Sequence, residues 1–237
     1  MIPKKIHYIW FGNNDKPKLV QKCIASWRQY CPDYEIIEWN ESNFDINSNI
    51  YIKQAYESKK YAFASDLVRL LVVKEHGGIY LDTDVEVVKP FCDLLGFDAF
   101  AGFENDDYIA TGLGFGSIPN SKFIDAMIEE YNEITFISHD GSLNIVPCPR
   151  LNSKAMEKIG FIMNGKKQVV DNIIALPVEY LNPYDDPTGR MRKTENTYSI
   201  HWYGKSWIAK QKVIRSRITR VFHRIFGVDC FNFLKRK

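Results

Sequence analysis

Segments with strand-like and helix-like hydrophobic patterns alternate through the first half of this 237-residue chain. Such alternation predicts a layered α/β fold whose central sheet is largely parallel. A sheet of this kind binds its ligands beyond the carboxyl ends of its strands. The expected strands are Lys5–Phe11, Glu35–Trp39, Ile79–Val88, Phe97–Phe103, Ile173–Leu176 and Asn196–Trp202, and the expected helices are Pro17–Tyr30, Ile52–Glu57, Tyr61–His76 and about 121–131. Residues 138–153 and 183–192 are expected to be loops.

Residues 77–88 carry the strongest functional signal, with the sequence Gly-Gly-Ile-Tyr-Leu-Asp-Thr-Asp-Val-Glu-Val-Val. The glycines end a helix, an apolar strand follows, and Asp82 and Asp84 interrupt that strand. Alternation along a strand puts both carboxylates on one face, where they repel unless a cation or a proton lies between them. A hard divalent ion accepts carboxylate oxygens and keeps positions open for phosphate, so the pair predicts a metal site that holds a diphosphate. The alternative is an edge strand with charged residues facing solvent.

Asp66 and Arg69 lie three residues apart in the expected helix Tyr61–His76, so they share one face. One interpretation is an exposed ion pair within the helix, worth roughly 0.3–0.5 kcal/mol. Most of the neighbouring residues are small or apolar, however, and a buried pair needs a partner or a ligand to offset its desolvation. Asp66 and Arg69 are therefore also candidates for binding the hydroxyl groups of a sugar.

Three blocks, in this order, resemble the DXD glycosyltransferases of sequence family 32: His7-Tyr-Ile-Trp-Phe-Gly, Ala64-Ser-Asp-Leu-Val-Arg and Gly77-Gly-Ile-Tyr-Leu-Asp-Thr-Asp. That family includes capsular and lipopolysaccharide sugar transferases and yeast-type mannosyltransferases, and the large glucosylating bacterial toxins carry a similar core. The similarity covers residues 5–90 and weakens beyond them. It implies a GT-A fold, a nucleotide-sugar donor, Mn²⁺ or Mg²⁺, and retention of anomeric configuration.

The resemblance also implies roles for individual residues. For two of them, Trp10 and Tyr80, packing in the core is the alternative. The implied roles are base stacking for Trp10, binding of the donor sugar for Asp66 and Arg69, contact with the sugar or phosphates for Tyr80, contact with the ribose and a metal-bound water for Asp82, and direct metal ligation for Asp84.

The segment from Ser199 to Trp207 (Ser-Ile-His-Trp-Tyr-Gly-Lys-Ser-Trp) resembles the one that closes over the diphosphate in related GT-A enzymes, although it is shorter. The resemblance implies that His201 is a third metal ligand through a neutral imidazole. It further implies that Lys205, Ser206 and Trp207 bind phosphate oxygens as charge develops on the leaving group. A purely structural histidine is the alternative for His201.

The glycine-rich passage Glu104–Gly116 follows the expected strand Phe97–Phe103. It is a candidate for lining the acceptor and the reacting face of the sugar, and the alternative is that its glycines serve only backbone turns. No nucleophile is assigned there. The resemblance implies a front-face route, in which the leaving phosphate deprotonates the incoming hydroxyl.

Composition and charge narrow the cellular setting. No run of eighteen apolar residues is present, and the first residues lack the apolar stretch of a secretory signal. The five cysteines are odd in number and widely spaced, which favours free thiols in a reducing cytoplasm. No G-x-G-x-x-G or Walker A sequence supports a dinucleotide or P-loop site.

Residues 210–237 hold nine Lys or Arg and one acid, whereas the rest of the chain holds 22 basic and 28 acidic side chains. Apolar residues recur in this segment at helical spacing, so it predicts a basic amphipathic helix. One interpretation is binding to an anionic membrane surface, which would place the protein peripherally on the inner membrane face. The other is packing against the acidic body. A nucleic-acid partner is not expected, because no reading motif is present.

The sequence therefore predicts a GT-A-like catalytic domain over residues 1–207 and a basic amphipathic tail over residues 208–237. The favoured function is metal-dependent, retaining transfer of a sugar from a nucleotide-sugar, expected to be UDP-linked, to a glycan or lipid-linked oligosaccharide in the synthesis of capsule or lipopolysaccharide. One alternative is a phosphohydrolase of the haloacid-dehalogenase type, although Val85 and Glu86 replace the Gly-Thr that usually follows its Asp-x-Asp. The other is a non-catalytic module that binds a nucleotide-sugar.

Overall fold

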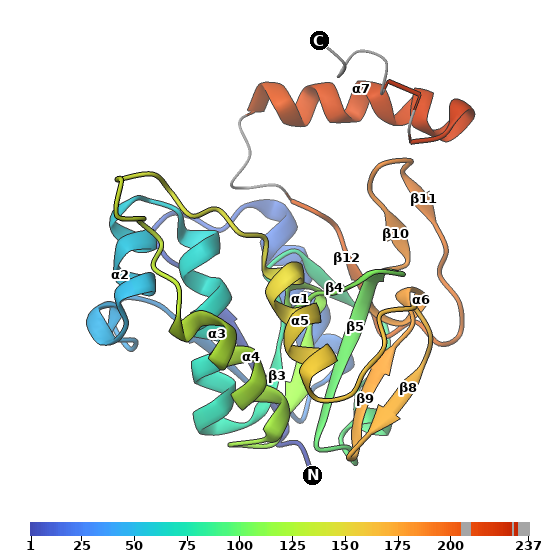
Figure 1. Cartoon of the computed structure of the whole chain (residues 1–237). Helices are drawn as coiled ribbons and strands as arrows, with labels where there is room; N and C mark the ends of the chain where they lie inside the picture. Colours follow the sequence, from blue (N-terminus) through green and yellow to red (C-terminus); the bar gives the residue numbers. More distant parts are fainter. Residues whose placement is uncertain (205–209, 229, 232–237) are drawn as a thin grey trace.

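The computed structural model describes residues 1–204, 210–228 and 230–231. Its helices and strands alternate along the chain, as the hydrophobic pattern predicts (Figure 1). The α-helices are α1 (Lys18–Tyr30), α2 (Ile50–Glu57), α3 (Tyr61–His76), α4 (Lys122–Asn132), α5 (Cys148–Lys158), α6 (Val178–Leu181) and α7 (Lys210–Phe226). The strands are β1 (Lys5–Ile9), β2 (Glu35–Trp39), β3 (Gly78–Tyr80), β4 (Val85–Val87), β5 (Ala99–Asn105), β6 (Tyr108–Ile109), β7 (Phe115–Ser117), β8 (Gln168–Val170), β9 (Ile173–Leu176), β10 (Tyr184–Asp185), β11 (Arg190–Met191) and β12 (Ser199–His201).

The central sheet has eight strands in the order β2-β1-β3-β7-β5-β9-β8, with β6 paired to β5. Strands β1, β2, β3, β5 and β9 share one direction, whereas β6, β7 and β8 oppose them. This arrangement confirms the predicted α/β class with a largely parallel central sheet. The carboxyl ends of β1 and β3 therefore meet at one edge, where a ligand site is expected.

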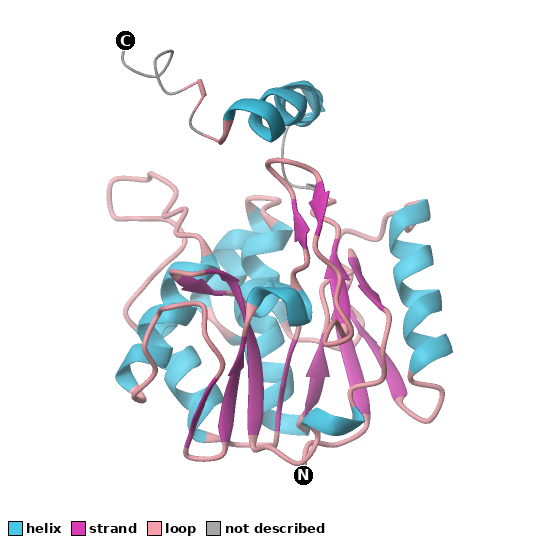
Figure 2. Cartoon of the chain, turned by 90° about the vertical axis from the view of Figure 1, so that its right-hand side faces the viewer, coloured by secondary structure: helices cyan, strands magenta, loops and turns pink. Residues whose placement is uncertain are grey.

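Helices cover both faces of the sheet (Figure 2). Helices α2, α3, α4 and α5 pack together over one face, and α1 lies on the other. Neighbouring residues of β3 show the alternation, because Ile79 belongs to the core on the α1 side and Tyr80 to the core on the α3 side. Gly77, with φ of 60°, ends α3, and the next residue starts β3.

The predicted strand Ile79–Val88 is two strands, and this corrects the argument for the paired acids. Strand β3 ends at Tyr80 and β4 begins at Val85, so Asp82 and Asp84 lie in the turn between them. The Val85 amide donates a 3.0 Å hydrogen bond to the Asp82 carbonyl and closes that turn. Strand β4 leaves the central sheet and pairs antiparallel with β12. A turn, and not the alternation of one strand, brings the two carboxylates together.

Two segments expected to be loops contain regular structure. Helix α5 begins within residues 138–153, with a proline in its first turn. Residues 183–192 form the short antiparallel hairpin β10–β11. The expected helix and strand boundaries elsewhere shift by a few residues, while Glu35–Trp39, Tyr61–His76 and Ile173–Leu176 are confirmed as predicted.

Helix α7 lies at the end of the molecule opposite the N-terminus, and the β10–β11 hairpin reaches up to it (Figure 1). Arg220 of α7 donates hydrogen bonds to the carbonyl and the carboxylate of Asp186, at 2.9 and 2.7 Å. The side chains of Val221, Phe222, Ile225 and Phe226 are exposed. Within the described residues, no helix is both long and apolar enough to span a bilayer.

Candidate functional site

Three potential metal ligands meet where β3, β4 and β12 come together. The pairing of β12 with β4 sets His201 opposite Val85, next to the turn that carries the two acids. Ligand atoms of Asp82, Asp84 and His201 all lie within 4.8 Å of one another. His201 Nε2 is 3.2 Å from Asp84 Oδ1, and the Gly204 amide donates a 2.6 Å hydrogen bond to Asp84 Oδ2.

The charges of this cluster depend on one another. Burial works to raise the pKa of Asp84, but His201 and the Gly204 amide outweigh it and hold that pKa below its ordinary value. Burial likewise works to lower the pKa of His201, but Asp84 outweighs it and raises that pKa. Burial raises the pKa of Asp82, Arg69 offsets this in part, and the charge of Asp84 adds to the rise. The charge of Asp82 is thus the less well compensated of the two, and a cation between the acids would stabilise it.

The donor set suits a divalent ion. Two carboxylates and one imidazole match the ligands of Mn²⁺, and Mg²⁺ accepts the same oxygens. His201 Nδ1 is buried and has no hydrogen-bond partner among the described residues. The imidazole therefore makes its one side-chain hydrogen bond within the described residues through Nε2, to Asp84, and its Nδ1 is left for a further ligand.

A second cluster joins α3 to the Asp82–Asp84 turn. Arg69 pairs with Asp66 on its own helix, and Arg69 Nη1 lies 3.6 Å from Asp82 Oδ1. The Tyr80 hydroxyl donates a 2.8 Å hydrogen bond to the same Asp82 oxygen, and the guanidinium lies 5.0 Å from the Tyr80 ring centroid. Burial raises the pKa of Asp66 to about 6, against the opposing charge of Arg69. The structure thus brings together four of the predicted site residues: Asp66, Arg69, Tyr80 and Asp82.

Arg69 has hydrogen-bonding capacity left over in this cluster. Its side chain is 3% exposed, and Nη1 has no hydrogen-bond partner among the described residues. A buried guanidinium with a free donor beside two carboxylates is suited to a hydroxyl-rich or anionic ligand.

Sequence reasoning missed three residues at the site. A Cβ atom on Gly112 would lie 2.7 Å from Asp82 Oδ2, so this glycine allows the chain to pass close to that carboxylate. Cys148, the first residue of α5, works to lower the pKa of Asp66, so its thiol lies beside that carboxylate. Glu104 faces His201 from β5, and burial raises the pKa of this carboxyl. Gly112 and Glu104 lie in the glycine-rich passage Glu104–Gly116, which was predicted to line the acceptor. Nothing in the sequence pattern distinguishes these two residues from the rest of the passage.

Trp10 lies just beyond β1, at the edge of the sheet that carries the site. Its indole donates a 2.7 Å hydrogen bond to the Asn14 carbonyl, and Lys16 Nζ lies 5.7 Å from its ring centroid. A cavity of about 490 Å³ opens beside this segment, between the loops that follow β1 and β2. Its lining residues include Gly12, Asn40 and Tyr61, but Trp10 is not among them.

Three predicted phosphate-binding residues, Lys205, Ser206 and Trp207, lie outside the described residues. The segment directly before them is described, and it reaches the site through the Gly204 amide on Asp84. In that segment the rings of His201 and Tyr203 lie 4.1 Å apart, and Asn182 donates a 2.8 Å hydrogen bond to the Tyr203 hydroxyl.

The sequence of this chain is similar to one family model and to several curated proteins. Residues 17–101 match the family model of the glycosyltransferase sugar-binding region containing the DXD motif. The protein "Subversion of eukaryotic traffic protein A" of Legionella pneumophila is 30% identical over 119 residues, which cover 39% of this chain and 18% of that protein. Inositol phosphoceramide mannosyltransferase 3 of Schizosaccharomyces pombe is 32% identical over 152 residues, which cover 61% of this chain and 41% of that protein.

The chain therefore spans less than half the length of these two curated relatives. Among solved structures, the PaToxG glycosyltransferase aligns with a TM-score of 0.49 at 22% identity, covering 66% of this chain and 68% of that chain.

Proposed function

Residues 17–101 belong to the DXD-containing sugar-binding region of glycosyltransferases, and from this premise we propose that the chain transfers a sugar from a nucleotide-sugar donor to a glycan or glycolipid acceptor. The observation that carries the proposal is the meeting of two clusters at one edge of the sheet. Asp82, Asp84 and His201 form one cluster, and the buried Asp66–Arg69 pair forms the other. Asp82 belongs to both, because it lies 3.6 Å from Arg69.

The first cluster would hold Mn²⁺ or Mg²⁺ together with the diphosphate of the donor. Asp84 and His201 would be direct ligands, and Asp82 would share its charge between the ion and Arg69. When bound, the ion would stabilise the negative charge that develops on the leaving diphosphate. Lys205, Ser206 and Trp207 are proposed to contact the same phosphates.

The second cluster would hold the donor sugar. Asp66 would accept hydrogen bonds from sugar hydroxyls, and the free Nη1 donor of Arg69 would bind a sugar or phosphate oxygen. The Tyr80 hydroxyl, which donates to Asp82 Oδ1, would hold that carboxylate between the ion and Arg69. We place the nucleoside at the ends of β1 and β2, with Trp10 against the base and the cavity beside Gly12 and Asn40 open to it. We expect the donor to be UDP-linked and the anomeric configuration to be retained.

We further propose that residues 1–207 act as a GT-A-like catalytic domain and that residues 208–237 bring it to an anionic membrane surface. In support, α7 attaches to the hairpin through Arg220, while its apolar side chains stay exposed. A membrane-associated acceptor such as a lipid-linked oligosaccharide, used in the synthesis of a surface polysaccharide, would suit that placement.

The proposal is tested by thermal unfolding with a panel of nucleotide-sugars, with and without Mn²⁺. The true donor is expected to raise the melting temperature by mass action, and only when the metal is present. The same donor should then release its nucleotide slowly in water and faster with an acceptor. Release of phosphate from simple phosphoesters would instead favour a phosphohydrolase, and binding without any turnover would favour a non-catalytic module.

A further inference from the structure

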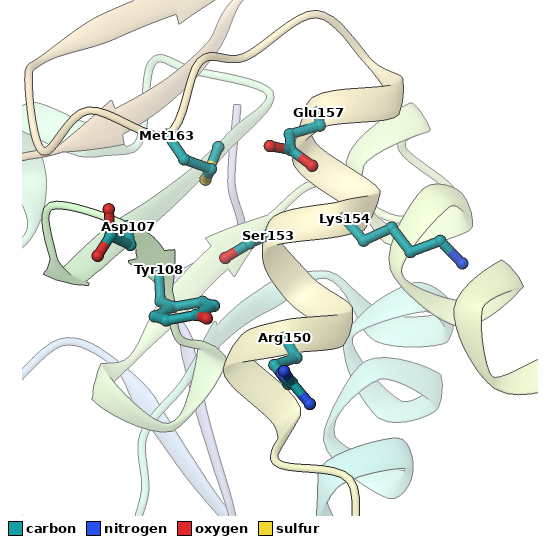
Figure 3. A pocket seen from close by; sticks show the side chains of 7 residues that line it. All are labelled: Asp107, Tyr108, Arg150, Ser153, Lys154, Glu157 and Met163. Atoms are coloured by element: carbon teal, nitrogen blue, oxygen red, sulfur yellow. The ribbon is translucent and has the colours of Figure 1, made fainter.

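A second cavity, of about 470 Å³, lies between α5 and the segment that contains β6 (Figure 3). Its walls carry the aromatic ring of Tyr108, the hydroxyl of Ser153 and the charged side chains of Asp107, Arg150 and Glu157. Asp107 and Tyr108 belong to the glycine-rich passage Glu104–Gly116, the candidate for lining the acceptor, whereas no role proposed above uses Arg150, Ser153 or Glu157. Pockets with an apolar or aromatic wall and a few convergent polar groups are the usual form of a small-molecule site.

The cavity lies next to the sugar-binding cluster. Tyr108 is four residues before Gly112, which touches Asp82, so the Cα atoms of Tyr108 and Gly112 are at most about 14 Å apart. On the other wall, Arg150 lies only two residues after Cys148, whose thiol lies beside Asp66. Both walls of the cavity therefore continue directly from residues at the sugar-binding cluster.

Hydrogen bonds between the two walls fix the backbone of the cavity. The Ile109 amide donates a 2.9 Å hydrogen bond to the Ser153 hydroxyl. The amide and the hydroxyl of Thr111 each donate a 3.0 Å hydrogen bond to Asn152 Oδ1. These bonds hold α5 against the chain that runs from β6 to the glycine at the site, and a preformed pocket costs little ordering when a ligand binds.

The charge in the cavity selects the class of ligand. Lys154 also borders it, but its ammonium pairs with Glu130 of α4 at 2.8 Å and points away from the opening (Figure 3). Glu130 also pairs with Lys158 at 2.5 Å, so Lys154 still adds its charge to this wall. The lining thus holds two cations, Arg150 and Lys154, and two carboxylates, Asp107 and Glu157. Within the described residues, no hydrogen bond or ion pair engages the side chains of Arg150, Asp107 and Glu157. The net charge of the lining is close to zero, which favours a neutral ligand over phosphates and sugar acids.

We propose that this cavity is the acceptor subsite and that it binds a neutral pyranose or an amino sugar. The proposal rests on the glycosyltransferase function proposed above. The Tyr108 ring packs on the apolar face of the sugar, the two carboxylates accept hydrogen bonds from its hydroxyls, and Arg150 donates to a ring or hydroxyl oxygen. A sugar has one apolar face and a rim of hydroxyl groups, so it suits a cavity lined by both an aromatic ring and charged side chains.

The test is saturation-transfer NMR on the full chain with UDP and Mn²⁺ present. The neutral probes are methyl glycosides of galactose, mannose and N-acetylglucosamine, and the anionic probes are glucuronic acid and glucose 6-phosphate. The neutral probes should bind at millimolar concentrations, and Tyr108→Ala and Glu157→Gln should each weaken that binding by about tenfold. Glu129→Gln, an exposed change on α4 outside the cavity, should bind as the wild type does.

The kinetic readout separates the subsite from the proposed function. In transfer assays, Tyr108→Ala and Glu157→Gln should raise the KM for the acceptor by about tenfold and leave the KM for the donor near that of the wild type. Unchanged sugar binding in Tyr108→Ala, preferred binding of the anionic probes, or no binding at all would overturn the subsite. A wild type that binds the neutral probes but never turns over a nucleotide-sugar would instead overturn the transferase proposal and leave the sugar site standing.

Discussion

His201 Nε2 lies 3.2 Å from Asp84 Oδ1, although the two residues are 117 positions apart in the sequence (201 − 84). The contact depends on the pairing of β12 with β4, since that pairing sets His201 opposite Val85. The Trp27 indole of α1 donates a 2.7 Å hydrogen bond to the Val85 carbonyl of β4 and so fixes this strand pair. The metal cluster thus depends on the β4–β12 pair, which α1 supports. This pair is a separate sheet from the central one.

Replacing Asp84 with Asn should remove metal-dependent activity while leaving the fold intact. An asparagine can still accept the Gly204 hydrogen bond, so apo stability should change little. Its neutral amide is a far poorer ligand than a carboxylate, and transfer should fall by at least about 100-fold, which corresponds to about 2.7 kcal/mol of transition-state stabilisation. Equilibrium dialysis with Mn²⁺ checks the binding. Asp93→Asn, which neutralises an exposed acid outside the site, is the control. Wild-type transfer by Asp84→Asn would refute the assigned ligand.

Gly112 supplies a test of steric fit at the site. An alanine there would place its Cβ 2.7 Å from Asp82 Oδ2 and 3.3 Å from Arg69 Nη1. The Asp82 carboxylate must then move, which disturbs its contact with Arg69. We expect Gly112→Ala to reduce donor binding and transfer by about tenfold or more. Gly96→Ala is the matched control, because a Cβ at Gly96 meets nothing within 4 Å. Donor titration by thermal shift distinguishes the two variants, and equal behaviour would show that Asp82 can move without consequence.

Much of the fold could be predicted from the sequence wherever a segment carries its own signal. Tyr61–His76 has a long helical pattern and a glycine stop, Glu35–Trp39 contains two isoleucines and a tryptophan, and Ile173–Leu176 is a short apolar run. Helix α5 escaped prediction because its sequence is mostly polar and its buried face is short. The β10–β11 hairpin has strands of two residues and is tied to α7 by Arg220, a contact that no local pattern reveals.

The candidate site divides in the same way. The motif identifies Asp82 and Asp84. The prediction that they share one face of a single strand is wrong, because a turn between β3 and β4 joins them. Only the resemblance predicted that His201 lies near Asp82 and Asp84. The spacing of residues in the sequence does not reveal that β12 pairs with β4. Gly112 and Cys148 could not be identified, because a close approach between distant segments depends on packing that one sequence does not show.

His7 predicts a loss of stability in mild acid. Burial lowers the pKa of His7 to about 4. The neutral ring donates from Nε2 to the Gly77 carbonyl at 2.8 Å and accepts from the Trp39 indole at Nδ1, at 3.1 Å. In the unfolded chain histidine takes up a proton near pH 6.5, so stability is present above that pH and is lost as the pH falls toward 4. The full difference is about 3 kcal/mol.

The measurement is urea unfolding at pH 7 and pH 4.5. His7→Gln should be less stable than the wild type at pH 7 and should lose less stability on acidification. His139→Gln, at an exposed histidine, should keep the wild-type pH dependence. If His7→Gln loses as much stability as the wild type, another group is responsible for the acid sensitivity.

The exposed apolar residues of α7 predict binding to anionic membranes. Ile225 and Phe226 are 67% and 69% exposed beside the basic residues of the same helix. Burying such side chains in a lipid interface stabilises binding by about 1.5–3 kcal/mol each. Ile225→Ser with Phe226→Ser should therefore weaken co-sedimentation with phosphatidylglycerol vesicles by at least about tenfold. The matched control carries Ile162→Ser and Val169→Ser, at residues that are 65% and 54% exposed on the body. Binding should also weaken with added salt and with purely zwitterionic vesicles. Equal loss in both double variants would show that surface hydrophobicity in general, and not α7, determines membrane binding.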